Sequence, residues 1–181
     1  MLPNLETSAL VVIDIQERLY PAMFEADQAS LVKATRNLVA AHKHFGGPVF
    51  FSEQYPRGLG PTIPELQEVL TGATRLEKVA FSVAREASHE AVLQGLPSDV
   101  VLVGIEAHVC VLLTGLDLLA AGHRVWIPID GVASRAPRFR DNGLAQLDQA
   151  GAQIVNSESL IFGQLERAGS DAFKTFSRMI R

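Results

Sequence analysis

Short apolar runs alternate with longer amphipathic stretches along the 181 residues of the chain. Apolar runs predict strands at residues 8–14, 48–52, 99–104, 124–130 and 152–156, and a weaker pattern predicts a further strand, third in chain order, at 74–79. Between them, apolar positions that recur every three or four residues predict helices at 27–45, 86–93, 111–121 and 140–150, with a helical tail from residue 157. A glycine follows each of the first four predicted helices, where a left-handed C-cap is favoured.

This order of elements predicts an α/β fold. The strands are short and apolar on both faces, which is typical of a parallel sheet covered on both sides. We therefore expect one domain over residues 1–181, a doubly wound (Rossmann-like), mostly parallel six-stranded sheet with helices on both faces. Residues 53–64 contain three prolines and two glycines, so we predict a loop without regular structure that acts as a lid or pocket wall.

Composition narrows the expected partners. Hydrophobic residues make up 48% of the chain, and the formal net charge is -4. An acidic balance argues against nucleic acid as a partner, because phosphate binding needs clustered Lys and Arg. No apolar stretch reaches the roughly 18 residues of a membrane span, and no leader is visible, so we expect no membrane partner. The lone cysteine cannot form an intramolecular disulfide, which favours a cytoplasmic location.

Chemistry-bearing residues follow the predicted strands. Asp14 ends the first strand, Lys78 lies near the end of the third, and Cys110 follows the fourth where a helix begins. Ligands of open parallel sheets bind beyond the carboxyl ends of the strands, so an acid, an ammonium and a thiol are expected at one edge.

These three residue types together suit nucleophilic catalysis. The start of a helix should lower the pKa of the Cys110 thiol, and its N–H groups could hold an oxyanion. The Asp14 carboxylate could accept the thiol proton, while Lys78 stabilises negative charge. The structural alternatives are a buried apolar cysteine, an aspartate that caps a helix and a solvated surface lysine.

Three segments carry a family resemblance. They are VVIDIQ at residues 11–16, Lys78 followed by Phe81 and Ser82, and GIEAHVCV at residues 104–111. In this order and spacing, the chain resembles the isochorismatase-like cysteine hydrolases from about Ala9 to Ile161. Residues 52–66 (SEQYPRGLGPTIPEL) are most similar to the branch of isochorismatase domain-containing proteins.

The resemblance implies a catalytic triad of Asp14, Lys78 and Cys110. Cys110 would attack a carbonyl to form an acyl-thioester, and Asp14 would act first as the base and then as the acid. Family members often carry a cis peptide before the nucleophile, which here corresponds to the bond between Ile105 and Glu106. The N–H groups of Glu106 or Cys110 are then the expected oxyanion donors.

Five further residues are candidates for substrate binding. Gln16 either binds in the pocket or caps the turn after the first strand, and His108 either lines the pocket or is an exposed loop residue. Tyr55 and Phe81 either form an aromatic wall or pack elsewhere. Arg135 either binds a substrate carboxylate or lies on the surface.

Departures from relatives exclude some chemistry. The nicotinamidase branch places one Asp and two His after the second strand to hold a metal, whereas this chain has SEQY at residues 52–55. We therefore expect no metal and no cofactor. True isochorismatases, which cleave a vinyl ether, lack the cysteine nucleophile that Cys110 would supply.

The favoured function is hydrolysis of a non-peptide C–N bond in a small amide, imide or ureido compound. The alternatives are a catalytically silent binding or scaffold protein, and an enzyme of another chemistry. Redox work fits poorly, because no second cysteine is present to resolve a disulfide. As in the family generally, a homo-oligomer is expected, a dimer or larger.

Overall fold

A parallel sheet forms the centre of the molecule. The computed structural model describes residues 1–165 and 167–180. All strand pairs are parallel, and the order across the sheet is β3-β2-β1-β4-β5-β7, with β6 beside β4. The strands are β1 (Ser8–Ile13), β2 (Val49–Gln54), β3 (Thr74–Lys78), β4 (Asp99–Ile105), β5 (Arg124–Pro128), β6 (Val132–Ala133) and β7 (Gln153–Val155).

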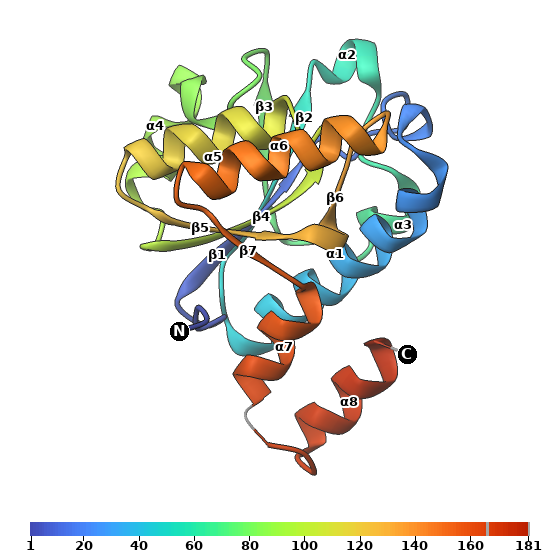
Figure 1. Cartoon of the computed structure of the whole chain (residues 1–181), viewed down its shortest axis with the longest axis vertical. Coiled ribbons are helices and arrows are strands. Elements are labelled where there is room, and N and C mark those ends of the chain that lie inside the picture. Colours follow the sequence, from blue (N-terminus) through green and yellow to red (C-terminus); the bar gives the residue numbers. More distant parts are fainter. Residues whose placement is uncertain (166, 181) are drawn as a thin grey trace.

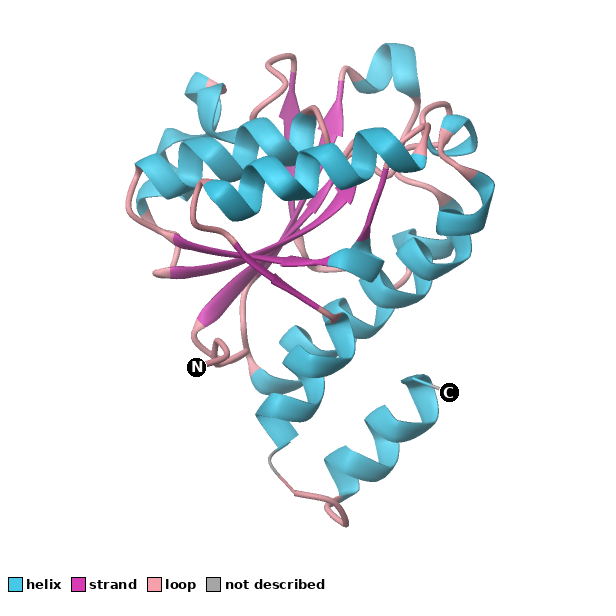
Figure 2. Cartoon of the chain, in the orientation of Figure 1, coloured by secondary structure: helices cyan, strands magenta, loops and turns pink. Residues whose placement is uncertain are grey.

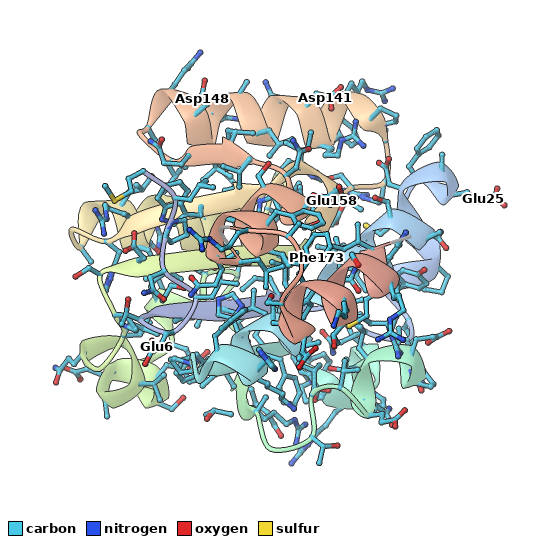
Figure 3. The ribbon with its side chains drawn as sticks, turned by 90° about the horizontal axis from the view of Figure 1, so that it is seen from below. Glu6, Glu25, Asp141, Asp148, Glu158 and Phe173 are labelled. Atoms are coloured by element: carbon cyan, nitrogen blue, oxygen red, sulfur yellow. The ribbon has the colours of Figure 1, made fainter. Side chains whose placement is uncertain are left out.

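Helices cover both faces of this sheet (Figures 1 and 2). One layer contains α1 (Glu25–Phe45), α7 (Ser157–Leu165) and α8 (Asp171–Ile180); the other contains α4 (Glu90–Gln94), α5 (Cys110–Ala120) and α6 (Pro137–Gln149). From below, α7 and α8 lie side by side in front of the sheet, marked by Glu158 and Phe173 (Figure 3). The α/β prediction of a mostly parallel sheet between two helical layers is confirmed.

Strand β1 shows why the sequence folds this way. Its side chains alternate, so Leu10 and Val12 belong to the core under α1, while Val11 and Ile13 belong to the core under α5. All six β1 residues are buried. A strand that is apolar at every position requires such burial on both faces.

The sheet has a seventh strand, so the prediction of six was wrong by one. β5 pairs with β4 only as far as Trp126, and Pro128, which has no N–H group, ends β5. A single 3-10 turn, η4 (Ile129–Gly131), then brings the two residues of β6 beside Gly104 and Ile105. Two residues carry too little periodicity to predict a strand.

The segment 53–64 is more regular than expected. β2 continues to Gln54, and Pro56 opens a helical turn, α2 (Pro56–Leu59). Pro64 likewise opens α3 (Pro64–Gln67). Proline suits the first helical position, since its missing N–H would have no partner there. The predicted helix at 86–93 is divided into η3 (Ala87–His89) and α4, and two more 3-10 turns are η1 (Tyr20–Ala22) and η2 (Val83–Arg85).

The strand order reverses between β1 and β4. The chain winds outward from β1 to β3, then crosses to β4 and winds outward the other way. Ligands of such sheets bind at the carboxyl ends of the two central strands. Asp14 follows β1, and residues 106–110 follow β4. None of the helices in the described part of the chain is long and apolar enough to cross a bilayer.

Candidate active site

Asp14 lies in an unusual backbone conformation directly after β1. Its φ of 52° is in the left-handed region, which Asp visits more readily than most residues. Such a conformation costs on the order of 1–3 kcal/mol and is found mostly where surrounding structure enforces it. Its N–H donates to the Ser52 carbonyl at 3.2 Å, and its side chain is fully buried.

Gly104 allows the two central strands to meet beside Asp14. Its φ is +128°, and a Cβ atom there would lie 2.1 Å from the carbonyl oxygen of Ile13. Only glycine permits this approach, so Gly104 sets the spacing between the ends of β1 and β4.

Lys78 forms a buried ion pair with Asp14. Its Nζ lies 2.6 Å from Asp14 Oδ2, and both side chains are 0% exposed. The same Nζ donates to Gln54 Oε1 at 2.7 Å and to the Phe81 carbonyl at 3.1 Å. An ammonium has three N–H donors, so all of them are used within the protein. Ser52 Oγ donates to the other carboxylate oxygen, Asp14 Oδ1, at 2.7 Å.

Cys110 is the first residue of α5 and is 5% exposed. Burial, which has the largest effect, and the Asp14 carboxylate, by its charge and as a hydrogen-bond partner, together raise the pKa of its thiol to about 12. Lys78 opposes this effect, while Glu106 adds to it. The expectation that the helix start lowers this pKa was therefore wrong: the resting group is a neutral thiol that faces a carboxylate base.

The turn between β4 and α5 supplies free backbone donors. The peptide bond between Ile105 and Glu106 is cis, as the resemblance implied. Within residues 1–165 and 167–180, the N–H groups of Glu106 and Cys110 donate no hydrogen bond to another protein group. Gly143 of α6 packs tightly against this turn, since a Cβ atom there would lie 2.6 Å from the Ala107 carbonyl oxygen.

Polar and aromatic side chains also surround this turn. Arg135 Nε donates to Glu106 Oε2 at 2.8 Å. His108 Nδ1 lies 3.0 Å from Ser134 Oγ, and the His108 ring stacks on Phe139 with a centroid distance of 4.9 Å. His108 is thus half-buried rather than an exposed loop residue, and Arg135 is an exposed guanidinium held by Glu106.

Gln16 is not available to a substrate. Its Nε2 donates to the carbonyls of Gln54 and Gly60 at 3.0 and 2.7 Å, and its Oε1 accepts the Gln54 N–H at 2.8 Å. The carboxamide therefore ties the turn after β1 to the end of β2. Of the two alternatives for Gln16, these contacts favour a role in fixing the turn after β1 over a role in binding a substrate.

Tyr55 and Phe81 lie on the surface near Lys78, 55% and 58% exposed. Tyr55 lines a cavity of about 290 Å³ with Lys78, Val79 and Glu86. The Phe81 carbonyl binds the Lys78 ammonium, and the Tyr55 N–H donates to the Lys78 carbonyl. Both residues are thus connected to the ion pair through their main chains.

A larger cavity, of about 760 Å³, lies elsewhere, between α4 and the end of α5, and Arg85 and Asp117 are among the residues that line it. It contains none of the three candidate catalytic residues. The candidate catalytic residues therefore lie apart from this larger cavity. Among the described residues, no group of three or more His, Cys, Asp and Glu side chains is arranged to hold a metal ion.

Sequence reasoning did not find the partners of the ion pair. It noted that SEQY at residues 52–55 follows the second strand but gave Ser52 and Gln54 no role. Polar residues at the end of an otherwise apolar strand were the available signal. Glu53 between them is buried against Thr62 and Arg75 and lies away from the ion pair.

Known proteins resemble this chain over most of its length. Isochorismatase domain-containing protein 2A of Mus musculus is 34% identical over 176 residues, covering 97% of this chain and 84% of that protein. A secreted isochorismatase effector of Phytophthora sojae is 34% identical over 180 residues, covering 97% and 85%. A solved structure described as the MAR1 ribonuclease of Caenorhabditis elegans is 35% identical with a TM-score of 0.89, covering 99% and 92%.

The family model for the isochorismatase domain matches residues 8–159. This range contains the sheet, Asp14, Lys78 and the turn that leads to Cys110. The chain therefore belongs to the isochorismatase-like hydrolase family.

Proposed function

We propose that this protein is a cysteine hydrolase that cleaves a non-peptide C–N bond of a small amide, imide or ureido compound. The observation that carries the proposal is the buried ion pair of Asp14 and Lys78, 2.6 Å apart, which lies close enough to the Cys110 thiol for the Asp14 charge to raise its pKa. A thiol, a base that faces it and unused N–H groups beside it are the components that acyl transfer requires.

The first half of the reaction acylates Cys110. Asp14 accepts the thiol proton while the sulfur attacks the substrate carbonyl carbon. With a thiol pKa of about 12, roughly one molecule in 10⁵ holds a thiolate at neutral pH, so proton transfer has to accompany attack. The N–H groups of Glu106 and Cys110 stabilise the oxyanion. Asp14 then returns the proton to the nitrogen as the C–N bond breaks.

The second half releases the acid. Asp14, again a carboxylate, accepts a proton from water as that water attacks the thioester carbonyl. The C–S bond breaks, and the proton returns from Asp14 to the sulfur. Lys78 does not contact the substrate in this scheme, because its three N–H groups are engaged. Its role is to keep the buried Asp14 charged.

Intact-mass spectrometry tests the proposal. The purified chain is incubated with a library of small amides and ureides, and an acyl adduct identifies both nucleophile and substrate, because Cys110 is the only cysteine. The Cys110→Ala variant should fold, form no adduct and lose turnover. Full turnover in Cys110→Ala would end the proposal, and a chain that neither turns over nor forms adducts would fit the silent binding protein.

The Caenorhabditis elegans relative, described as a ribonuclease, suggests a second candidate function. We favour small amides because this chain has 16 Lys and Arg against 20 Asp and Glu, and binding of a polynucleotide needs a cationic track. Wild type and Cys110→Ala are compared on a single-stranded RNA. Cleavage that persists without the cysteine would favour the ribonuclease over our proposal.

Two expectations remain predictions. Light scattering of the purified chain would measure its molar mass in solution and so test whether it forms a homo-oligomer. Fractionation of the source cells would test the cytoplasmic location.

A further inference from the structure

The end of β2 presents two polar side chains to the ion pair. Successive strand residues point to opposite faces, so Ser52 and Gln54 lie on one face and Glu53 on the other. Ser52 contacts Asp14 and Gln54 contacts Lys78. One strand end thus holds both members of the ion pair.

Ser52 holds Asp14 at two points. Its carbonyl accepts the Asp14 N–H at 3.2 Å, which supports the left-handed backbone, and its hydroxyl donates to Asp14 Oδ1 at 2.7 Å. Ser52 is only 1% exposed, so water cannot readily replace this donor. The terminal torsion of an aspartate is otherwise broad. The hydroxyl therefore fixes which carboxylate lone pairs remain for the thiol.

Gln54 holds Lys78 and is itself held. Its Oε1 accepts a hydrogen bond from Lys78 Nζ at 2.7 Å, and its Nε2 donates to the Val79 carbonyl at 2.7 Å. Its own N–H donates to Gln16 Oε1 at 2.8 Å. The Gln54 carboxamide thus has a fixed orientation, and its oxygen keeps the Lys78 ammonium directed at Asp14.

We propose that Ser52 and Gln54 are positioning residues, which fix the Asp14 carboxylate and the Lys78 ammonium so that proton transfer from Cys110 has one geometry. This inference rests on the proposed function. Neither side chain needs to contact the substrate, so their effect should appear in the base-assisted reactivity of the thiol.

Alkylation of Cys110 by iodoacetamide measures that reactivity without knowledge of the substrate. An S–C bond forms, the C–I bond breaks with loss of iodide, and the thiol proton passes to Asp14. Because the chain has one cysteine, the adduct mass reports this site alone. If Asp14 accepts the thiol proton, the alkylation rate of the wild type should be level between about pH 6 and pH 9. The alkylation rate of an unassisted thiol should instead rise about tenfold per pH unit below the thiol pKa.

Substitutions at the end of β2 should lower the level part of this profile. Ser52→Ala removes the hydroxyl that fixes the orientation of the Asp14 carboxylate, so we expect about a tenfold lower rate. Ser52→Thr, which retains the hydroxyl, should recover most of the rate. Gln54→Leu should lower the rate several-fold, since the ammonium loses one of its acceptors.

Matched variants control for simple loss of a buried polar group. Ser8 is also a buried strand serine, bonded to His42 at the opposite end of the sheet, and Ser8→Ala should leave the profile unchanged. Gln67 is exposed and its carboxamide donates to the Thr62 carbonyl, so Gln67→Leu controls for the loss of a glutamine carboxamide outside the site. Circular dichroism establishes that each variant folds.

The outcomes separate the two proposals. A wild-type profile with no level part would contradict base assistance and hence the proposed function. A level part that persists unchanged in Ser52→Ala and Gln54→Leu would overturn the positioning roles alone. If Ser52→Ala does not fold, Gln54→Leu decides the question.

Discussion

The two ends of the sheet bury polar side chains in opposite ways. At the amino end, Ser8 of β1 lies 3.3 Å from the ring of His42, and both residues are 0% exposed. The other His42 ring nitrogen lies 2.9 Å from the Leu38 carbonyl. Burial lowers the pKa of His42 to about 4, so the pair is neutral at physiological pH.

At the carboxyl end, the buried groups are charged. Asp14 and Lys78 are each fully buried, and the Asp14 backbone is held in the left-handed region. A serine and a histidine resemble part of a hydrolase site, yet Ser8 and His42 are both fully buried, and the group at the second His42 ring nitrogen is a main-chain carbonyl instead of a carboxylate. Polar residue types therefore do not distinguish a structural pair from a catalytic one. What sets the carboxyl end apart is its buried charge, the left-handed backbone of Asp14 and the cysteine beside it.

The largest expected effect is that of Asp14→Asn. Loss of a general base and acid lowers amide hydrolysis by roughly 10²–10⁴-fold. The same change removes two of the causes that raise the pKa of the Cys110 thiol, so this pKa should fall below about 12. Steady-state rates and the ultraviolet absorbance of the thiolate measure the two effects. An unchanged thiol titration would show that Asp14 does not face Cys110.

Lys78→Met should destabilise the fold strongly. It leaves the Asp14 charge buried without a partner, which typically costs about 3–5 kcal/mol of unfolding free energy. Urea unfolding measures the loss.

Lys174→Met is the matched control for Lys78→Met, because Lys174 pairs with Asp171 on the surface, where such pairs contribute only about 0–1 kcal/mol. The double variant Asp14→Asn with Lys78→Met should lose less than the sum of the single changes. Additive losses would mean that the two charges are not coupled.

The amino end should respond to pH. The pKa of His42 is about 4 in the folded chain, against the ordinary 6.5, so the unfolded state binds the proton first as pH falls. Stability is then complete above about pH 6.5 and declines by about 3 kcal/mol towards pH 4.

His42→Leu should flatten the pH dependence of urea unfolding in this window, whatever its effect at neutral pH. His44→Leu, at an exposed position of the same helix, should leave the slope intact. A slope that survives in His42→Leu would assign the acid sensitivity to other groups.

The smallest effect is expected from Ser8→Ala. It removes a single neutral hydrogen bond, which contributes about 1 kcal/mol to stability. Thermal unfolding should report this loss with no change in amide hydrolysis. A hydrolytic defect would indicate that the two ends of the sheet are coupled.

The sequence by itself determined the parallel sheet and the edge of it where the proposed catalytic residues lie. Strand β1 is apolar at nearly every position, which predicts burial on both faces, and Asp14, Lys78 and Cys110 each stand at or after a strand end. Helix boundaries marked by Gly46 and Gly122 could be predicted, because both residues adopt left-handed conformations.

Only the tertiary structure decided what surrounds these residues. The hydrogen bond from Lys78 to Gln54, the one from Ser52 to Asp14 and the two-residue strand β6 depend on segments far apart in the sequence. The raised thiol pKa depends on burial, which opposes the local effect of the helix start. Desolvation and charge pairing arise from three-dimensional packing, so no local pattern of residues can reveal which one dominates.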